Sequence, residues 1–236
     1  MINKRVASAQ EAVADIFDGA TVMVGGFGEA GSPIELLHAL IDHGATGLTV
    51  VNNNTGSGEV GLAALIKAGR VARMICSYPR STNSTVFPEK YRAGVTALEL
   101  VPQGTLAERI RAAGAGIPAF YTPTSVGTPL EEGKERRSFH GRDYVLEEAL
   151  HADFALVRAR AADRYGNVIY NKTARNFGPV MAMAARTTIV QVSEVVEPGA
   201  MDPEVVITPG LFVDRVVLVE DPAHESALVA EGMSYP

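Results

Sequence analysis

The stretch Asp18–Pro33, DGATVMVGGFGEAGSP, decides the fold. Within it, Thr21–Val24 is short and apolar, a pattern typical of a buried strand. Glycines follow at once, and Ser32–Glu35 (SPIE) has the pattern of a capping box with proline at the first helical position. A strand, a glycine-rich loop and a helix start in direct succession offer backbone N–H groups to a phosphate or to a developing oxyanion.

Strand and helix patterns alternate outward from this stretch. Ser8–Glu11 forms another capping box, apolar residues at helical spacing follow it up to Gly19, and the helix that starts at Pro33 ends at Gly44. Further strands are expected at 48–51, 71–76, 96–101, 154–158, 187–192 and 213–219, and further helices at 62–68, 106–113 and 179–185. This alternation predicts an α/β fold, an open and mostly parallel sheet with helices on both faces.

The domain organisation follows from length and from breaks in the pattern. A chain of 236 residues is long enough for between one and two domains of roughly 150 residues. We predict a single domain over residues 1–222 and a weakly ordered C-terminal tail over residues 223–236. The polar segment 127–142 is interpreted as a long surface loop or a hairpin.

Composition narrows the classes of function. Apolar residues make up 47% of the chain and charged residues 20%, as in folded globular proteins. The formal net charge of −6 argues against a general nucleic-acid binder, but it leaves room for a local anion site. A single cysteine, Cys76, favours a reducing compartment. Because the chain has no secretory signal pattern and no apolar run long enough to span a bilayer, we expect a soluble cytoplasmic protein that does not bind membranes.

The glycine loop alone has several interpretations. Its spacing Gly26-x-Gly28-x-x-Gly31 matches the dinucleotide fingerprint. That fingerprint needs an acidic residue after the second strand to hold the ribose, and Asn52–Asn54 stand there instead, which disfavours a nicotinamide dehydrogenase. A phosphate or oxyanion site and a tight turn that needs glycine only for packing both remain open.

Polar side chains follow two further expected strands. Asn52–Gly56 (NNNTG) comes after strand 48–51, and Gln103 comes after strand 96–101. Ligands of open α/β sheets bind where the strands end, and amide groups there orient carboxylates or donate to oxyanions. An asparagine-rich turn and a plain strand-to-helix turn explain the same residues without a ligand, so both interpretations stay open.

Longer motifs resemble those of a known family. The stretch Asp18–Pro33 is similar to the signature of the alpha (A) subunits of family I CoA-transferases. The similarity extends over nearly the whole chain, from about residue 2 to residue 222. Further matching blocks are Val101–Arg111 (VPQGTLAERIR), Gly116–Phe120, Asp153–Val157, Gly166–Val168 and Ala174–Phe177.

The resemblance implies an enzyme subunit that is incomplete alone. Family members move CoA by a ping-pong exchange on a glutamate, which lies in a Ser-Glu-Asn-Gly motif of the beta (B) subunit. This chain lacks the motif, since Ser193-Glu194 continues into Val195. The implied partner is therefore a beta subunit that carries it, in an α2β2 assembly, and the implied substrate is CoA, supplied as succinyl-CoA, with no permanently bound cofactor. By resemblance Gln103 is the oxyanion donor, and the residues that bind substrate or CoA are Gly25, Gly26, Phe27, Gly28, Glu29, Ala30, Gly31, Asn53 and Asn54.

The resemblance also bears on the acceptor acid. It favours 3-oxoadipate, an intermediate of aromatic degradation by the β-ketoadipate pathway, with acetoacetate as the alternative. The chain departs from the family where Asn52 replaces a usual serine and Thr55 a common alanine. A non-catalytic ligand-binding α/β protein is a second alternative, although the chain before Asp18 is too short for the helix-turn-helix that such sensors carry. The segments that favour 3-oxoadipate are Cys76–Arg80, Ser84–Phe87, Tyr91–Gly94 and Phe177–Ala185.

Other residues with possible chemistry have simpler explanations. Cys76 lies in an apolar strand, which favours a buried structural thiol over a nucleophile. The five histidines have no metal-ligand spacing, so no metal site is predicted. A dicarboxylic substrate needs a cation at its far end; Arg80, Lys172 and Arg175 are candidates, with surface ion pairs as the alternative explanation.

Overall fold

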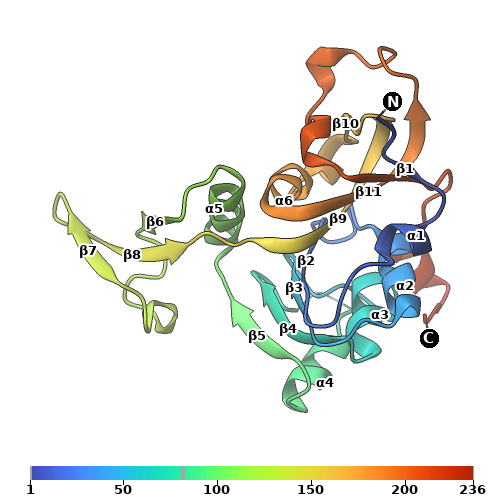
Figure 1. Ribbon diagram of the computed structural model, residues 1–236. Coiled ribbons are helices and arrows are strands. Elements are labelled where there is room, and N and C mark those ends of the chain that lie inside the picture. Colours follow the sequence, from blue (N-terminus) through green and yellow to red (C-terminus); the bar gives the residue numbers. More distant parts are fainter. Residues whose placement is uncertain (1, 81–82, 236) are drawn as a thin grey trace.

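The computed structural model describes residues 2–80 and 83–235. Within them the strands form a nine-stranded sheet and a separate three-stranded sheet (Figure 1). The helices are α1 (Ala9–Val13), α2 (Ile34–His43), α3 (Gly61–Lys67), α4 (Val86–Arg92), α5 (Gln103–Gly114), α6 (Gly178–Ala184) and α7 (Glu225–Ala230). The strands are β1 (Arg5–Val6), β2 (Thr21–Val24), β3 (Leu48–Val51), β4 (Val71–Cys76), β5 (Ala97–Leu100), β6 (Ala119–Thr122), β7 (Arg136–Phe139), β8 (Arg142–Glu148), β9 (Ala152–Asp163), β10 (Val168–Ile169), β11 (Ala185–Val196) and β12 (Arg215–Leu218).

The large sheet has the order β1-β12-β11-β9-β2-β3-β4-β5, and all of these neighbours pair in parallel. Only β10 within the described residues joins it antiparallel, on β9. Alternate side chains of β2 enter different cores: Val22 and Val24 pack with apolar residues of α1, α2 and α3, whereas Met23 packs with those of α5 and α6. Helices therefore cover both faces, and the predicted open, mostly parallel α/β sheet is confirmed.

The two expected capping boxes have different outcomes. Ser8 Oγ accepts a hydrogen bond from the Glu11 amide at 3.1 Å, which confirms the first box. The second is wrong, because no side chain caps α2. The Glu35 carboxylate instead accepts from Gln191 Nε2 at 2.5 Å and from the Ala223 amide at 2.6 Å. Tertiary partners on β11 and on the C-terminal segment thus replace the local contact on which the box depends.

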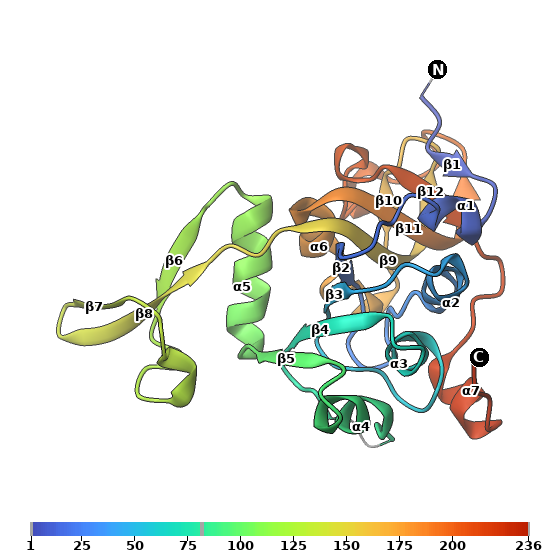
Figure 2. The same cartoon turned by 60° about the horizontal axis from the view of Figure 1, so that its bottom comes forward.

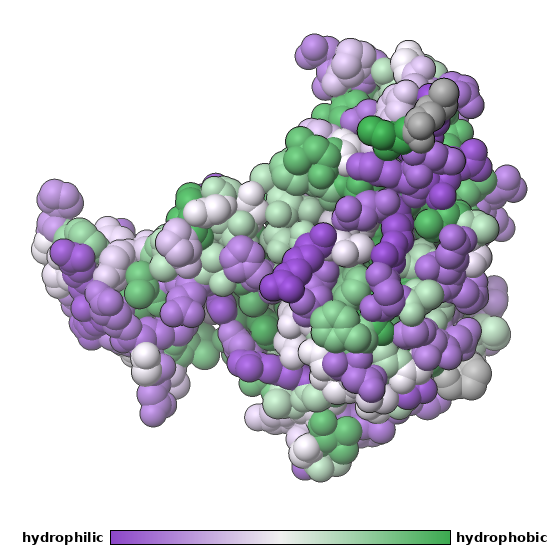
Figure 3. All heavy atoms as spheres, in the orientation of Figure 1, coloured by the Kyte–Doolittle hydropathy of each residue, from purple (hydrophilic) through white to green (hydrophobic). Residues whose placement is uncertain are grey.

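An arm, residues 119–148, extends away from the large sheet (Figures 1 and 2). Its strands pair antiparallel in the order β6-β8-β7. Figure 3 shows the arm standing apart from the main body, with a largely hydrophilic surface on the face in view. The pairing of β7 with β8 confirms the hairpin alternative for segment 127–142, and β6 adds a strand that the sequence pattern does not reveal.

The arm is fastened at its base by polar contacts. Arg109 Nε of α5 donates to the Glu148 carbonyl at 2.8 Å. Lys134 pairs with the buried Glu147 at 2.5 Å, so the arm is also tied within itself. The contact of Arg109 therefore joins α5, which packs on the large sheet, to the last residue of β8.

The C-terminal segment packs against α2 and α3 (Figure 2). The ring of Tyr235 stacks on His38 with centroids 3.8 Å apart, and its hydroxyl donates to Asp42 at 2.9 Å. Glu225 of α7 is buried, and this burial raises the pKa of its carboxyl above the usual range. The segment 223–236, expected as a tail, thus contains a helix and makes defined contacts through residue 235. None of the described helices combines the length and apolar character needed to cross a bilayer.

Candidate active site

Four neighbouring strands end at one edge of the sheet and surround a pocket of about 470 Å³. Strands β2, β3, β4 and β5 lie side by side (Figure 2), so the residues after their carboxyl ends come together. The structure therefore brings the predicted Asn53, Asn54 and Gln103 to the tip of the glycine loop. This cavity, called the Asn53 pocket below, is lined by Phe27, Gly28, Asn53, Asn54, Ser77, Tyr78 and Gln103.

The side chain of Asn53 is the centre of hydrogen bonding in this pocket. Its Oδ1 accepts from Ser77 Oγ at 2.6 Å and from Gln103 Nε2 at 2.9 Å. With both donors on Oδ1, the amide of Asn53 turns its nitrogen away from Ser77 and Gln103. Asn53 Nδ2 has no hydrogen-bond partner among the described residues, and Gln103 Nε2 retains a second N–H. The pocket thus offers two amide donors that are oriented before a ligand arrives, which is what stabilises an oxyanion.

Asn52 lies beneath the pocket. It is buried, and its Nδ2 donates to the Val24 carbonyl at 2.6 Å while its Oδ1 accepts from the Asn54 amide at 2.8 Å. The side chain therefore ties the end of β3 to the end of β2 and shapes the turn that presents Asn53. Asn52 thus supports the pocket from below and is not one of its lining residues.

The glycine loop, Gly25–Gly31, reaches the pocket only at its tip. The Phe27 amide donates to the Ala30 carbonyl at 3.0 Å, and Gly26 and Gly28 have φ values of +126° and +58°, which favour glycine. Phe27 and Gly28 are exposed and line the Asn53 pocket, whereas the first and last residues of the loop are buried. Of the predicted set Gly25–Gly31, Phe27 and Gly28 thus form a wall of the pocket, Gly25, Gly26 and Gly31 form a buried base, and Glu29 and Ala30 are half-buried.

Neither Glu29 nor the start of α2 faces this pocket. Ser226 Oγ donates to the Glu29 carboxylate at 3.0 Å, which places that carboxylate against the C-terminal segment. At the start of α2 the Leu36 amide donates to Gln191 Oε1 at 3.3 Å, and the Glu35 carboxylate lies in the same turn. An anion there would meet a carboxylate, so the structure gives the helix start no role in anion binding.

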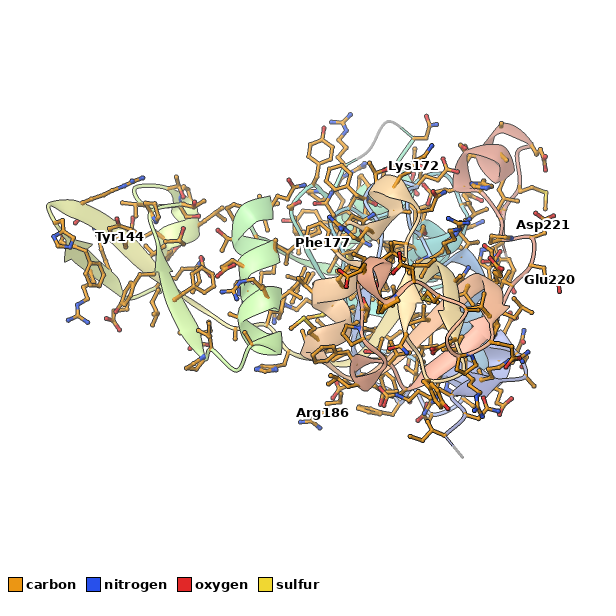
Figure 4. The ribbon with its side chains drawn as sticks, turned by 90° about the horizontal axis from the view of Figure 1, so that it is seen from above. Tyr144, Lys172, Phe177, Arg186, Glu220 and Asp221 are labelled. Atoms are coloured by element: carbon orange, nitrogen blue, oxygen red, sulfur yellow. The ribbon has the colours of Figure 1, made fainter. Side chains whose placement is uncertain are left out.

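A second hollow, of about 670 Å³, adjoins the Asn53 pocket across Phe27. Lys172 and Arg175, from the 3-10 turn η2 (Lys172–Arg175), line it, and Figure 4 shows Lys172 at the surface. Neither side chain has a carboxylate within ion-pair distance in the described part of the chain, and Arg80 does not line this hollow. Of the three candidate cations, Lys172 and Arg175 thus line the hollow beside Phe27, and Arg80 does not.

Cys76, the last residue of β4, is fully buried, and burial raises the pKa of its thiol to about 12. We expect a thiol reagent such as dithionitrobenzoate to leave the folded protein unmodified at pH 8 and to modify it in guanidinium chloride, because only an accessible thiolate reacts. Absorbance at 412 nm measures both. Rapid labelling of the folded protein in step with loss of activity would contradict a purely structural thiol.

Sequence reasoning missed two groups of residues at the site. Ser77 and Tyr78 follow β4 at the same sheet edge as Asn53 and Gln103, so the rule that identified those amides applies to them equally. Asn176 contacts the glycine loop from 150 residues away, and no spacing rule indicates that contact. Among the described residues, no cluster of three His, Cys, Asp or Glu side chains is arranged to hold a metal ion.

Comparison with known proteins adds a family and several relatives. The model of the family described as Coenzyme A transferase matches residues 6–218. The chain is 60% identical to the A-type subunit of 3-oxoadipate CoA-transferase of Pseudomonas putida, over 96% of this chain and 98% of that one. It is 51% identical to the A-type subunit of succinyl-CoA:3-ketoacid coenzyme A transferase of Xanthomonas campestris pv. campestris strain B100, over 93% and 90%.

A solved structure has the same fold. The acyl-CoA transferase YdiF of Escherichia coli O157:H7, as apoenzyme, superimposes with a TM-score of 0.84 at 25% identity. The match covers 94% of this chain and 48% of that one, so the chain spans about half the length of YdiF.

Proposed function

The chain belongs to the coenzyme A transferase family, and from that premise we propose that it is the alpha subunit of a two-subunit enzyme that moves CoA from succinyl-CoA to 3-oxoadipate. The observation that carries the proposal is the pair of oriented amide donors, Asn53 Nδ2 and Gln103 Nε2, beside the tip of the glycine loop. The name of the relative from Pseudomonas putida supports the acceptor acid. We propose further that residues 1–222 form the CoA-transferase domain and that residues 223–236 are a C-terminal extension of it, whose described part packs against α2 and α3.

The partner, the beta subunit, supplies a glutamate in a Ser-Glu-Asn-Gly motif, and the assembly is α2β2 in the cytoplasm, with no nucleic acid or membrane involved. The glutamate carboxylate attacks the thioester carbonyl carbon of succinyl-CoA, and the C–S bond breaks to give an acyl-glutamyl anhydride and the CoA thiolate. The thiolate attacks the glutamyl carbonyl and releases succinate. The 3-oxoadipate carboxylate then attacks the glutamyl-CoA thioester, and CoA leaves and returns to the acyl carbon, which restores the glutamate.

This chain stabilises the oxyanions of that sequence. Each addition to a carbonyl places negative charge on one oxygen, and the amides of Asn53 and Gln103 donate to it. Ser77 holds Asn53 in the donating orientation. Phe27 and Gly28 form the wall along which the CoA arm lies, and CoA is a substrate that leaves after each cycle.

The cations Lys172 and Arg175 give the proposal a test of substrate class. Succinyl-CoA and 3-oxoadipate both carry a carboxylate at the end remote from the reacting carbonyl, whereas acetoacetate carries none. Loss of one charge-assisted hydrogen bond costs about 1.5–3 kcal/mol, so we expect Lys172→Gln with Arg175→Gln to raise the KM for 3-oxoadipate roughly 10- to 100-fold. Initial rates with 3-oxoadipate and with acetoacetate, both from succinyl-CoA at saturation, measure the difference. An equal change in KM for both acceptors would show that these cations do not bind the remote carboxylate.

The function itself is tested by a CoA-transfer assay on this chain alone and co-expressed with a partner that carries Ser-Glu-Asn-Gly. Transfer to 3-oxoadipate only by the pair supports the proposal. Preference for acetoacetate would favour the second candidate, a succinyl-CoA:acetoacetate transferase, which the relative from Xanthomonas campestris supports. Transfer by the lone chain would place the nucleophile here and overturn the proposed division of the site.

A further inference from the structure

Asn176 follows η2 and lies behind the glycine loop. Its Oδ1 accepts from the Gly26 amide at 3.2 Å, and its Nδ2 donates to the Ala30 carbonyl at 2.8 Å. One side-chain amide thus contacts both limbs of the turn that has Phe27 and Gly28 at its tip. The contact crosses about 150 residues of sequence, so it is a tertiary contact that the loop cannot supply for itself.

The same amide is fixed by its own surroundings. Oδ1 also accepts from the Phe177 amide at 2.7 Å, and Nδ2 also donates to the Thr173 carbonyl at 3.0 Å. Asn176 therefore uses both hydrogens of its amide and accepts two hydrogen bonds on its oxygen. In Figure 4 Phe177 and Lys172, at the two ends of this segment, are labelled on the ribbon that leads into α6. All four hydrogen bonds are to backbone atoms. The amide therefore fixes the path of the loop backbone, whatever side chains the loop carries.

Close packing leaves the loop no other place on this side. A Cβ added at Gly31, which has φ +82°, would lie 2.4 Å from the Ala174 carbonyl oxygen and 3.1 Å from Asn176 Nδ2. The base of the glycine loop thus rests directly on η2, with room only for glycine. Van der Waals contact at Gly31 and hydrogen bonds at Gly26 and Ala30 together hold the glycine loop in one conformation.

We propose that Asn176 is a positioning residue, whose amide holds the glycine loop in the shape that places Phe27 and Gly28 at the wall of the Asn53 pocket. Its catalytic consequence rests on the proposed function. A shift of about 1 Å in a group that positions substrate can cost about 100-fold in rate, although Asn176 itself touches no substrate. The segment that carries Lys172 and Arg175 is joined to the glycine loop by the same amide, so one residue sets the spacing between the two hollows on either side of Phe27.

The chain offers a matched control in Asn167, in the turn between β9 and β10. This residue is also half-buried; its Nδ2 donates to Asp163 at 2.8 Å and its Oδ1 accepts from the Gly210 amide at 2.9 Å. It contacts no residue of the glycine loop. A general loss of stability therefore affects Asn167→Ala and Asn176→Ala alike, while a loss of loop position affects only the second.

The test combines hydrogen exchange with kinetics on the assembled protein. In Asn176→Ala we expect amide exchange of the peptide covering residues 25–31 to rise about fivefold for each hydrogen bond lost, since a net hydrogen bond contributes about 1 kcal/mol. We expect kcat to fall about 30- to 100-fold with KM within threefold, because the substrate still binds but its geometry is lost. Asn167→Ala leaves both within twofold of wild type. Asn176→Asp keeps the acceptor for Gly26 but faces two carbonyls, so we expect exchange at Gly26 near wild type and an intermediate kcat.

Unchanged exchange at residues 25–31 in Asn176→Ala, or faster exchange with full turnover, would overturn the inference. If Asn176→Ala fails to assemble, Asn176→Asp is judged by kcat against Asn167→Ala, and equal turnover overturns the inference. Failure of the proposed function has a different signature, since wild type would then transfer no CoA while the exchange result still reports on the loop.

Discussion

Replacing Gln103 by alanine is expected to lower the kcat of the assembled transferase about 100- to 1,000-fold, the usual loss for one oxyanion donor. Gln103 is exposed in the first turn of α5, where alanine is a good helix former, so the melting temperature should stay close to that of wild type. Its Nε2 both donates to Asn53 Oδ1 and faces the pocket, so the variant loses a donor and one of the two groups that orient Asn53.

The control for this prediction is Gln10→Ala. Gln10 is likewise exposed in the first turn of a helix, α1, and has no contact with the Asn53 pocket. Steady-state rates with saturating succinyl-CoA and 3-oxoadipate measure kcat for both variants. Turnover of Gln103→Ala within threefold of Gln10→Ala would remove Gln103 from the oxyanion site.

Asn53→Asp is expected to lower kcat by at least about 100-fold while the protein keeps its fold. The aspartate is isosteric and keeps an oxygen to accept from Ser77 and Gln103, so both orienting hydrogen bonds remain. What changes is the atom that faces the ligand: a donor becomes a carboxylate oxygen, which repels the developing oxyanion. The variant therefore separates the donor role of Asn53 from its role as a shared acceptor.

Asn3→Asp makes the same change of charge at a remote position. Asn3 is exposed, and its side-chain oxygen accepts from the Arg5 amide at 3.2 Å, so the acceptor is retained there too. Thermal unfolding followed by circular dichroism and steady-state kinetics compare the two. Equal kcat in Asn53→Asp and Asn3→Asp would show that the amide nitrogen of Asn53 plays no part in the reaction.

The parts of the fold that are local in sequence could be predicted. The strand at 71–76 has the bounds of β4, because an apolar run between a glycine-containing turn and a polar turn is a local signal. β6 could not be predicted from periodicity, because its residues AFYT do not alternate between apolar and polar and all four are half-buried. The false capping box at Ser32 has the opposite cause: the motif is present, but Gln191 and Ala223 hold Glu35 in place of the cap.

The same division holds for the site. Asn53 and Gln103 could be predicted because the carboxyl ends of neighbouring parallel strands meet at one edge. The hydrogen bond from Gln103 Nε2 to Asn53 Oδ1 could not be predicted, since strand order determines which residues are near each other and not where an amide points. Asn176 lies within a matching motif, Ala174–Phe177, but its contact with Gly26 depends on β10 and η2 folding back over the edge of β9. Only the folded structure of the chain reveals that contact.

The position of β9 between β2 and β11 sets an order of events on the ribosome. The set β2–β5 is available to pair once about residue 100 has been made, but the other edge of β2 has no neighbour until residues 152–163 emerge. β1, made before this set, pairs only with β12 at residues 215–218. At roughly 5–20 residues per second the ribosome takes several seconds to make the intervening chain. During that interval the free edge of β2 presents unpaired backbone N–H and C=O groups, so the arm-containing middle of the protein delays the closure of its own sheet.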